Sequence, residues 1–426
     1  MSHGVAAPRA EEVLPDHPEG RPVSPQARAV RPAKAVHLTS VHVADDNRIF
    51  HKECRSLAAA GFEVVLVAPH PADEVFQGIQ IRAVPKPGNR LVRMFVTTTR
   101  VLRRGVAEKG DVYHIHDPEM VPWALVLRLM GKPVVYDVHE DYVTGIAAVD
   151  YLPKPIAWSA ARIYSLFENI ARRTFTIVIA ERYYERRLKG AVHVLNHMRQ
   201  DLADGLAAIP RTTEPQARPR FLYAGSITES RGALILAELT TRVPGIELVM
   251  VGRCYPELLE QMEARSGDTA INLVDEDGET TVHRANDAPN AASLTIEGVG
   301  FHVPHERIIH ALSQQWTGAL AVFPPSDFYR EKELTKFFEY MAAGLPIISS
   351  NFPTWRALIE THEVGLVVDP RSLDEVASAA LRLHSRPDEA WRFAQNGRTA
   401  MAEHFSWSSQ ADRLIDVYNR LITKTA

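Results

Sequence analysis

Residues 327–350 read DFYREKELTKFFEYMAAGLPIISS, and this stretch decides the fold. Thr335 is of the residue type that caps helix N-termini, so we expect a short helix over residues 336–343 with Thr335 as its N-cap. Gly344 ends that helix, because glycine accepts the left-handed backbone conformation that closes helices. The apolar residues 345–349 follow at once and predict a buried strand. A helix that runs straight into such a strand is one unit of an alternating α/β fold.

The same alternation extends over most of the chain in both directions. Short apolar runs alternate with stretches whose apolar residues follow helical spacing, such as residues 49–60 and 120–130. Near-continuous valine and isoleucine runs are typical of strands covered on both faces, so the sheets should be parallel. The expected strands are residues 36–41, 64–68, 79–84, 111–116, 133–139, 176–180 and 193–195, followed by 221–225, 247–252, 294–297, 319–323, 345–349 and 365–368. The sequence therefore predicts an α/β protein with doubly wound sheets.

Prolines and polar residues divide the chain into units. Residues 1–33 carry six prolines and no apolar periodicity, so we expect a disordered tail there. A second break with prolines, residues 210–220, indicates a linker between two domains. The expected units are an N-terminal Rossmann-like domain over 34–209, a C-terminal Rossmann-like domain over 221–404 with a polar surface insertion at 266–292, and a C-terminal helix over 405–426. The two Rossmann-like domains should face each other across a cleft.

Composition excludes several classes of protein. Lysine and arginine total 48 against 52 aspartates and glutamates, a formal net charge of −4, whereas general nucleic-acid binders are normally basic. Two cysteines, Cys54 and Cys254, allow neither a disulfide scaffold nor a cysteine-rich zinc site. No apolar run is long enough to span a membrane, and residues 1–33 lack the apolar core of a signal peptide. No Gly-x-Gly-x-x-Gly follows a first strand, which argues against a nicotinamide enzyme. We expect a cytoplasmic enzyme that binds no nucleic acid.

One candidate anion-binding site follows the strand at residues 221–224. Gly225 and Ser226 begin the turn after it, where a glycine lets a ligand approach the backbone closely. Arg231 should lie in the first turn of the next helix, where a guanidinium can hold a phosphate with two hydrogen bonds. An ordinary strand–helix turn with a surface arginine explains the same residues.

A second candidate site lies in the opening stretch. Glu331 and Glu339 are separated by seven residues. Glu339 falls about one turn inside the expected helix, where its carboxylate can accept two hydrogen bonds from a cis-diol such as ribose. Lys336, one turn earlier, can reach a diphosphate. The same two glutamates could instead lie on a solvated helix face. The direct passage from Gly344 into a strand argues against that interpretation.

The loop after the first strand and the helix that follows it are rich in polar residues. These residues are His42, Asp45, Asp46, Arg48 and His51. They are candidates for a binding site, and a helix capped by Asp46 or Asn47 explains the same pattern. Farther on, His114 and His116 alternate along one strand, which fits either a metal site or structural histidines at a strand end.

Two segments combine arginines with large apolar side chains. The first carries Arg90, Arg93, Arg100, Arg103 and Arg104 among Leu91, Met94, Phe95, Val101 and Leu102. Residues 154–173 have a similar mixture. Such a combination can rest on an anionic membrane surface, and a solvated helix face explains it as well. Two such segments favour a lipid-linked acceptor and a peripheral contact with the inner face of the membrane.

As a set, these motifs resemble the GT-B glycosyltransferase family 4. Glu331-x7-Glu339 followed by residues 340–348 (YMAAGLPII) is similar to the signature of that large retaining family. Four more stretches fit it: residues 135–142 (VYDVHEDY) resemble its strand-end histidine motif, 111–118 (DVYHIHDP) the motif before it, 225–232 its phosphate loop, and 297–312 its strand–helix passage. The resemblance covers residues 35–422 apart from the insertion, and it is specific only as a set.

The resemblance implies a GT-B fold whose C-terminal helices cross back to the N-terminal domain. The C-terminal domain would hold a sugar linked to UDP or GDP, and the N-terminal domain would hold the acceptor. Glu339 would bind the ribose, Arg231 and Lys336 the diphosphate beside Gly225 and Ser226, and Glu331 the hydroxyls of the donor sugar. His139 would lie close to the donor sugar and its developing positive charge. His42, Asp45, Asp46, Arg48, His51 and His116 would border the acceptor.

Two departures from the family pattern leave assignments open. The family usually has glycines just after the first glutamate, whereas this chain has Lys332, Glu333 and Leu334. Glu331 and Glu333 therefore compete for the donor sugar. The phosphate loop also lacks the family's common first arginine, so Arg231 is its only basic residue and Lys336 is the expected substitute.

The expected activity is a retaining transfer from a nucleotide-diphosphate sugar to a saccharide or lipid-linked acceptor, in surface-polysaccharide or lipopolysaccharide assembly. Family 4 enzymes are thought to use front-face attack, in which the leaving phosphate accepts the acceptor's proton. We therefore expect no dedicated nucleophile, no cofactor and no required metal, because cations and helix N-termini can stabilise the leaving group. Two alternatives are a sugar-nucleotide epimerase of the same fold, which would need carboxylates flanking C2 of the sugar, and a catalytically silent scaffold.

Overall fold

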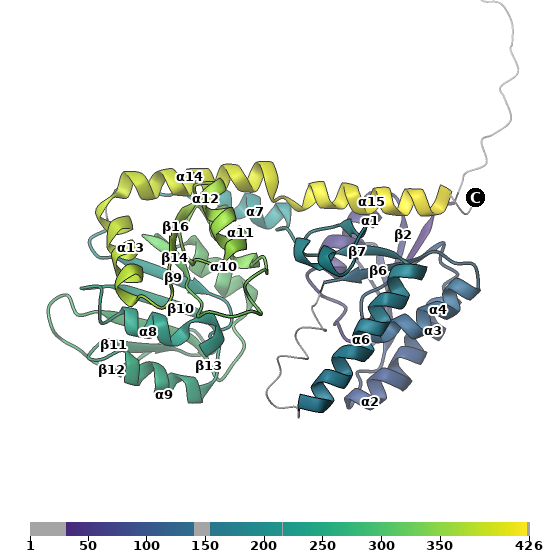
Figure 1. Cartoon of the computed structure of the whole chain (residues 1–426), viewed down its shortest axis with the longest axis horizontal. Coiled ribbons are helices and arrows are strands. Elements are labelled where there is room, and N and C mark those ends of the chain that lie inside the picture. The colour runs from purple at the N-terminus through teal and green to yellow at the C-terminus, as the bar shows by residue number, and fades with distance from the viewer. Residues whose placement is uncertain (1–30, 140–153, 215, 424–426) are drawn as a thin grey trace, which may run out of the picture. The chain divides into compact units, whose positions relative to one another are not determined.

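The computed structural model describes residues 31–139, 154–214 and 216–423 (Figure 1). Most of the expected N-terminal tail and residues 140–142 of the histidine motif lie outside these ranges. The described chain forms two eight-stranded sheets, each with its own helices. We call the first sheet with its helices the first lobe, and the second sheet with its helices the second lobe.

The sheet of the first lobe has the order β3-β4-β2-β1-β5-β6-β7-β8. All neighbouring strands are parallel except β3, which runs antiparallel to β4 at the edge. The strands are β1 (Lys34–Leu38), β2 (Glu63–Pro69), β3 (Glu74–Phe76), β4 (Ile79–Val84), β5 (Val112–Ile115), β6 (Val134–Val138), β7 (Thr176–Ile179) and β8 (Val192–His193). The helical segments are η1 (Ile49–Cys54), α1 (Arg55–Ala59), α2 (Arg90–Val92), η2 (Arg93–Thr97), α3 (Thr98–Ala107), η3 (Pro118–Met120), α4 (Val121–Leu129), α6 (Lys154–Thr174) and η4 (Arg182–Arg186).

The sheet of the second lobe has the order β12-β11-β13-β10-β9-β14-β15-β16. Only β12 is antiparallel to its neighbour. The strands are β9 (Arg220–Ala224), β10 (Glu247–Cys254), β11 (Ala270–Val274), β12 (Thr280–Arg284), β13 (Ser293–Val299), β14 (Gly318–Ala321), β15 (Ile347–Ser350) and β16 (Gly365–Val368). The helical segments are α7 (Gln200–Ala207), η5 (Glu229–Arg231), α8 (Ala233–Leu239), α9 (Pro256–Arg265), α10 (His305–Ser313), α11 (Thr335–Ala343), α12 (Pro353–Thr361), α13 (Leu373–Ser385) and α14 (Pro387–His404).

The central strands of both sheets are buried along nearly their whole length, as the apolar runs predicted. Because both faces of each sheet are covered, polar side chains can gather in the loops that follow the carboxyl ends of the strands. The expectation of two parallel, doubly wound sheets is confirmed.

The last helix, α15 (Trp407–Thr423), packs on the first lobe, although α14 before it belongs to the second. Leu414 and Val417 join the apolar core around β1 and β2, and Trp407 Nε1 donates a hydrogen bond of 2.9 Å to Ser56 Oγ. Figure 1 shows α15, in yellow, alongside the strands of the first lobe. The expected return of the C-terminal helix is confirmed.

Several local expectations need correction. The insertion at 266–292 is not only a surface loop, because β11 and β12 lie inside it and extend the sheet by two strands. Thr335 is the first helical residue of α11 rather than its cap, and Leu334 precedes it without a side-chain cap. Gly344 ends the helix as predicted, with a φ of 65°. Among the described residues, none of the helices is both long and apolar enough to cross a membrane.

Candidate active site

The carboxyl edge of the second sheet brings three donor-site candidates together. Gly225 follows β9 with a φ of 119°, a conformation that favours glycine, and a side chain there would approach Lys336 Nζ to 3.5 Å. Ser226 continues the turn, and its carbonyl accepts a hydrogen bond of 2.8 Å from the Tyr223 hydroxyl. Arg231 lies in the short turn η5 before Gly232, and not inside helix α8 as expected.

Arg231 is held toward this edge by an aromatic hydroxyl. Its Nε donates a hydrogen bond of 3.2 Å to Tyr329 Oη. Burial lowers the pKa of Arg231, but its contacts with Tyr329 and Tyr223 outweigh burial and raise it. The guanidinium therefore stays charged and can meet an anion at the end of β9.

Lys336 carries a buried amine that forms no ion pair with any residue that the structure describes. Its side chain rises from the first turn of α11, and Nζ lies 3.7 Å from the centroid of the Tyr223 ring and 5.0 Å from that of Phe323. Nζ makes no hydrogen bond within the described part of the chain. Burial lowers the pKa of Lys336 well below its ordinary value, and the charge of Arg231 lowers it further. Arg231 and Lys336 are two basic side chains facing one turn, and an anion bound there would pair with Arg231 and favour protonation of Lys336.

Glu339 lies one helical turn after Lys336 and is half-buried. Burial raises the pKa of its carboxyl group, and the charges of His305, Lys336 and Lys52 oppose that shift. A carboxylate one turn from a cationic site can accept hydrogen bonds from hydroxyls of the same ligand. Arg231, Lys336 and Glu339 together therefore suit an anionic ligand that also carries a diol.

Glu331 and Glu333 precede α11 and are already ion-paired. Glu331 Oε1 lies 2.8 Å from Arg186 Nη1, and Glu333 Oε1 contacts Arg182 Nη1. The backbone N–H of Glu333 donates a hydrogen bond of 3.1 Å to Glu181 Oε2. Each glutamate must therefore leave or share its arginine before it can face a donor sugar.

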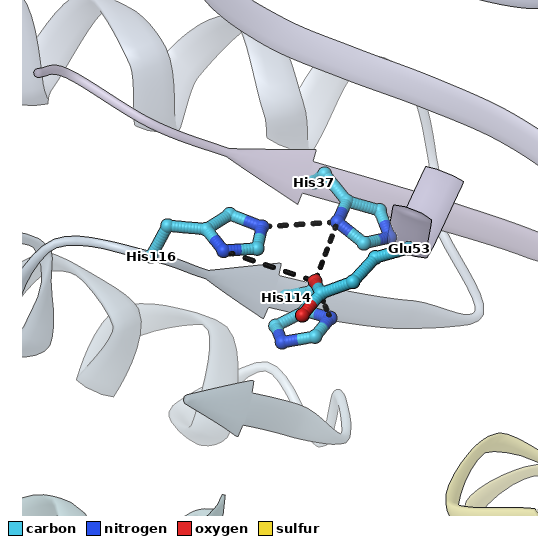
Figure 2. Close-up of side chains that lie close together, drawn as sticks. All are labelled: His37, Glu53, His114 and His116. Atoms are coloured by element: carbon cyan, nitrogen blue, oxygen red, sulfur yellow. Dashed lines mark hydrogen bonds and ion pairs between the residues drawn. The ribbon is translucent and has the colours of Figure 1, made fainter. Parts of the chain in front are cut away.

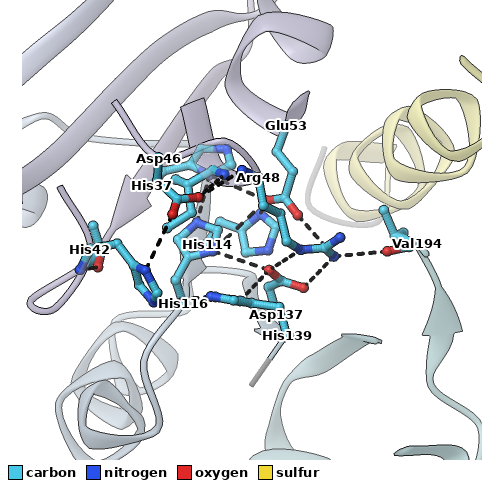
Figure 3. A network of polar contacts seen from close by, with 12 residues as sticks. His37, His42, Asp46, Arg48, Glu53, His114, His116, Asp137, His139 and Val194 are labelled. Atoms are coloured by element: carbon cyan, nitrogen blue, oxygen red, sulfur yellow. Dashed lines mark hydrogen bonds and ion pairs between the residues drawn. The ribbon is translucent and has the colours of Figure 1, made fainter. Parts of the chain in front are cut away.

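The carboxyl edge of the first sheet holds the acceptor-side candidates. His139 follows β6, and its Nε2 lies 3.1 Å from Nε2 of His42 in the loop after β1. Asp137, inside β6, lies 2.8 Å from Nδ1 of His139 (Figure 3). In the same loop and helix, Nε2 of His51 lies 2.6 Å from Oδ1 of the exposed Asp45.

Asp46 and Arg48 serve the local structure as well as the site. Asp46 Oδ1 accepts hydrogen bonds of 2.8 Å from the backbone N–H groups of both Arg48 and Ile49. The helix η1 begins at Ile49 with Arg48 as its N-cap, so neither Asp46 nor Asn47 holds the expected cap position. Arg48 is buried and donates from Nε and Nη2 to Asp137, at 2.8 and 2.7 Å, and from Nη2 to the carbonyl of Val194 at 2.9 Å (Figure 3). A guanidinium used in this way positions Asp137.

Family models cover both lobes of the chain. The model described as "Glycosyl transferase 4-like domain" matches residues 47–192, and the model described as "Glycosyl transferases group 1" matches residues 208–400. The chain belongs to the family 4 glycosyltransferases of the GT-B fold. It is an enzyme of the hexosyltransferase type that uses nucleotide sugars.

Known proteins resemble this glycosyltransferase over nearly its whole length. It is 25% identical over 379 residues, 85% of this chain and 86% of the relative, to a phosphatidyl-myo-inositol mannosyltransferase of Mycolicibacterium smegmatis. Its fold matches the sucrose-phosphate synthase of Thermosynechococcus elongatus with a TM-score of 0.65, at 17% identity, covering 92% of this chain and 100% of that one. It also matches Anabaena HepE in complex with UDP-glucose with a TM-score of 0.61, at 12% identity, covering 91% and 99% of the two chains.

The glycosyltransferase also carries a buried cluster that the sequence only partly indicated. His37 from β1, His114 and His116 at the end of β5, and Glu53 from η1 face one another with almost no exposure to solvent (Figure 2). Burial lowers the pKa of His37 and His114 well below that of an ordinary imidazole, so both rings are neutral. Burial also raises the pKa of Glu53 well above its ordinary value.

This cluster has the donor chemistry of a transition-metal site but not its spacing. Glu53 Oε2 lies 4.0, 3.8 and 4.0 Å from Nδ1 of His37, His114 and His116. Ligands of a tetrahedral zinc ion lie only about 3.3 Å apart, since each bond is about 2.0–2.1 Å long. His37 Nδ1 is already 3.0 Å from His116 Nε2, and His114 Nδ1 is 2.9 Å from the Tyr418 hydroxyl. These contacts therefore favour the interpretation of His114 and His116 as structural histidines at a strand end over a metal site.

Sequence reasoning missed Asp137, Asp117 and Glu53 as parts of the acceptor-side edge. Asp137 stands two residues before His139, and alternate strand residues share a face, so this spacing was a usable signal. Asp117 Oδ2 accepts hydrogen bonds of 2.5 Å from the backbone N–H of Ser40 and 3.1 Å from the Ser40 hydroxyl, which ties the loop after β1 to the end of β5. Glu53 gave no signal, because a charged residue on a helix is usually solvated.

Proposed function

We propose that this enzyme is a retaining glycosyltransferase that moves a hexose from a UDP- or GDP-linked sugar to a lipid-linked or saccharide acceptor. Its products would belong to cell-surface glycolipid, polysaccharide or lipopolysaccharide assembly. The nucleotide-sugar donor is supported by the buried amine of Lys336, which lies near Arg231 at the end of β9 and has Glu339 one turn away. A nucleoside diphosphate supplies both the negative charge and the diol that these side chains suit.

The proposed roles follow from charge and position. Arg231 and Lys336 bind the diphosphate, Gly225 and Ser226 admit it to the backbone, and Glu339 binds the ribose. Glu331, with Glu333 as the competing residue, binds hydroxyls of the donor sugar after giving up its arginine. His139 faces the sugar from the other lobe.

The chemistry we propose needs neither a nucleophilic side chain nor a metal ion. The bond between the anomeric carbon and the phosphate oxygen breaks, and the acceptor oxygen bonds to the same face of that carbon. The hydroxyl proton of the acceptor passes to the departing phosphate oxygen. Lys336, Arg231 and the N-terminus of α11 stabilise the charge that develops on the diphosphate.

The lipid-linked acceptor is supported by the surface of the first lobe. Leu91 and Phe95 are 70% and 61% exposed, on the helical segment that also carries Arg90, Arg100 and Arg103. On α6, Trp158, Ile163 and Leu166 are each more than half exposed. Exposed apolar side chains among arginines are what a helix on an anionic membrane surface presents. The mannosyltransferase relative, whose name gives phosphatidyl-myo-inositol, agrees with such an acceptor.

The test has a binding arm and a transfer arm. Thermal shifts are measured with UDP, GDP and ADP and their common sugars, for the wild type, Glu339→Ala and the control Glu360→Ala, whose glutamate pairs with Arg356 on the exposed helix α12. We expect one nucleotide to raise the melting temperature of the wild type and the control but not of Glu339→Ala. The selected sugar nucleotide is then incubated with vesicles that contain phosphatidylinositol, or with saccharides, and the anomeric configuration of the product is read by NMR.

Each outcome of these assays decides between the functions considered. A product with the anomeric configuration of the donor supports a retaining transferase, and the acceptor that is consumed identifies its class. Inversion would contradict the proposed mechanism. A sugar nucleotide that is epimerised without an acceptor would support the epimerase, and the absence of any shift or product would support the silent scaffold.

A further inference from the structure

An apolar cavity of about 930 Å³ lies at the carboxyl edge of the first sheet. Its walls are formed by the loop after β1 (residues 41 and 43–45), by residues 69–73 at the end of β2 and by residues 83–87 at the end of β4. Most of the lining side chains are aliphatic or proline. The volume falls in the range of pockets that bind small organic ligands, about 300–1,000 Å³.

The walls at the ends of β2 and β4 are tied to each other. The backbone N–H of His70 donates a hydrogen bond of 3.2 Å to the carbonyl of Val84. The backbone N–H of Ala83 donates one of 2.9 Å to Asp73 Oδ1. Both walls are also rich in proline, whose ring fixes φ and adds apolar surface without a backbone donor that would need a partner. The prolines that line the cavity are Pro69, Pro71, Pro85 and Pro87. These walls are therefore in place before any ligand binds.

The third wall, the loop after β1, is held by a chain of side-chain contacts. The Ser40 hydroxyl donates a hydrogen bond of 2.9 Å to Glu119 Oε1. Glu119 in turn accepts hydrogen bonds of 2.8 and 3.1 Å from Nε and Nη2 of Arg93, which lines the cavity from η2. Arg93 therefore helps to fix the loop on one side of the cavity and forms part of the lining on another.

The cavity lies beside the acceptor-side histidines. Val41 and Val43 line it, and His42 stands between them in the chain. Nε2 of His42 lies 3.1 Å from Nε2 of His139, which follows β6 (Figure 3). A molecule whose reacting hydroxyl lies near His139 therefore has this cavity across a single loop.

The charged groups of the lining leave one basic side chain for a ligand. The other ionisable side chains of the lining each contact another ionisable group, and these are Asp45, His70, Asp73, Arg93 and Arg104. The Lys86 side chain is exposed and forms no ion pair or hydrogen bond with any residue in the described ranges. An apolar cavity with an ammonium group beside it suits a molecule that joins a hydrocarbon part to an anion.

We propose that this cavity holds the hydrocarbon chain of an anionic lipid acceptor, with Lys86 beside the anionic group. The assignment rests on the proposed function and narrows its acceptor to a lipid. Aliphatic and proline side chains offer no partners to the hydroxyl groups of a saccharide, whereas a hydrocarbon chain needs none. Arg93 lines the cavity from the helical segment that also exposes Leu91 and Phe95, so the cavity adjoins the surface that we propose meets the membrane.

The experiment measures the binding of monomeric alkyl phosphates to the full-length enzyme without any donor. Hexyl, octyl and decyl phosphate are titrated below the concentrations at which they form micelles. We expect each added CH₂ group to tighten binding about three- to fourfold, as the burial of a CH₂ group does. Affinity that does not depend on chain length would overturn the proposal, because the chain would then remain in water.

Variants locate the bound molecule. Ala72→Trp fills the cavity from an exposed position of its wall, and we expect it to weaken the binding of decyl phosphate at least tenfold. Ala59→Trp, at an exposed position of α1 outside the lining, is the matched control and should bind like the wild type. Lys86→Gln should weaken decyl phosphate but not decyl glucoside, which carries the same chain on a neutral head group. Wild-type affinity in Ala72→Trp would overturn the proposal, and wild-type affinity in Lys86→Gln would overturn the role of Lys86.

Leu91→Ser/Phe95→Ser separates the cavity from the helix surface. We expect this variant to bind monomeric decyl phosphate like the wild type, because neither side chain lines the cavity. A loss as large as that of Ala72→Trp would place the chain on the helix and overturn the proposal. So would a wild-type protein that binds no alkyl phosphate but forms a dimer that Ala72→Trp dissociates, because a second copy of the chain would then occupy the cavity.

A transfer assay tests whether the bound lipid is the acceptor. Decyl phosphate should slow transfer to an acceptor in phosphatidylinositol vesicles and leave the affinity for nucleotide unchanged. Tight binding of decyl phosphate with an unchanged transfer rate would overturn the assignment to the acceptor. A wild type that transfers no sugar would contradict the proposed function, whereas the titration, which needs no donor, would still decide whether the cavity binds a hydrocarbon chain.

Discussion

The ammonium nitrogen of Lys336 lies 3.7 Å from the centroid of the Tyr223 ring and makes no hydrogen bond within the described residues. Burial lowers the pKa of this group well below that of a free lysine. The unfolded chain therefore binds a proton that the folded chain releases, so Lys336 lowers the stability, increasingly as the pH falls below the ordinary lysine value. A buried amine in this position is explained by a ligand rather than by the fold, because a bound anion would favour its protonated form.

Replacing this lysine should separate stability from binding. We expect Lys336→Met to raise the melting temperature by a few degrees, because an unpaired buried amine costs about 1–3 kcal/mol and the contact with Tyr223 returns only part of it. The same variant should lose most of its affinity for UDP or GDP. Calorimetry and nucleotide titration check the two effects, with the exposed Lys189→Met as the control. A destabilised variant that still binds nucleotide would contradict the assignment.

Glu339 should make donor binding depend on pH. Burial raises the pKa of its carboxyl group, so the charged form that accepts ribose hydroxyls is lost earlier on acidification than for a free glutamate. We expect nucleotide affinity to fall as the pH decreases from 7.5 to 5.5. We expect Glu339→Gln to bind roughly ten- to a hundredfold more weakly at pH 7.5. Isothermal titration measures both.

Inorganic pyrophosphate supplies the control for that titration, because it offers the diphosphate without a ribose. Its affinity should be nearly the same for the wild type and for Glu339→Gln. If the substitution weakened pyrophosphate and nucleotide equally, Glu339 would act on the phosphates and not on the ribose.

Arg48 and Asp137 should behave as one unit in stability measurements. Removing one partner of a buried ion pair leaves an uncompensated charge, which costs about 3–5 kcal/mol. We expect Arg48→Met and Asp137→Leu each to lose stability of that order in urea unfolding, and the double variant to lose clearly less than the sum. Additive losses would show that the two bonds of 2.7 and 2.8 Å contribute little.

This pair shows where sequence reasoning stops. The strand-end motif around His139 could be found from the sequence, and so could the helix that Gly344 ends, because both lie within a few consecutive residues. Arg48 and Asp137 meet only because β1 and β6 are brought to the same edge with β5 between them. The sequence of either segment alone does not show that Arg48 and Asp137 will meet. Arg48 was therefore interpreted as a candidate ligand-binding residue.

The missed strands have a different cause. The residues of β3 are exposed along its whole length, and those of β12 are exposed except for Arg284 at its end. Both are edge strands that pair with one neighbour, so neither carries the apolar run by which the central strands were recognised. β11 was missed as well, although it pairs with two neighbours, because the polar residues around it favoured a surface insertion. Hydrophobic patterning therefore predicted most of the covered strands and failed at the edge strands that face water.

Membrane contact by the first lobe should depend on Leu91 and Phe95. We expect the wild type to float with vesicles that contain anionic lipid at low salt and to be released at high salt, because arginines contribute part of the attraction. The double variant Leu91→Ser/Phe95→Ser should lose most of this binding and keep its affinity for nucleotide. The control is Val282→Ser, which removes a 69% exposed side chain from β12 of the second lobe. Equal flotation of all three proteins would contradict a membrane role for this helix.

His197 gives the clearest pH effect on stability. It is buried against the rings of Phe338 and Phe405, each with its centroid 5.4 Å away, and burial together with the charges of Arg182 and Lys52 lowers its pKa to about 3. An unfolded histidine binds its proton near pH 6.5, so between pH 6.5 and pH 3 only the unfolded chain gains a proton from this residue. Its contribution to stability is therefore complete above pH 6.5 and is lost as the pH falls, by about 2 kcal/mol at pH 5. His197→Phe should remove that loss, because phenylalanine fits the same aromatic contacts without titrating.

The measurement is urea unfolding of the wild type and of His197→Phe at pH 7.5 and pH 5. Other buried imidazoles, such as His37 and His114, titrate in both proteins, so the difference between the two proteins isolates His197. His302→Gln, at an exposed position, is the control and should follow the wild type. If His197→Phe lost as much stability as the wild type between the two pH values, the ring of His197 would accept a proton in the folded chain. Its packing between Phe338 and Phe405 would then have to open near pH 5.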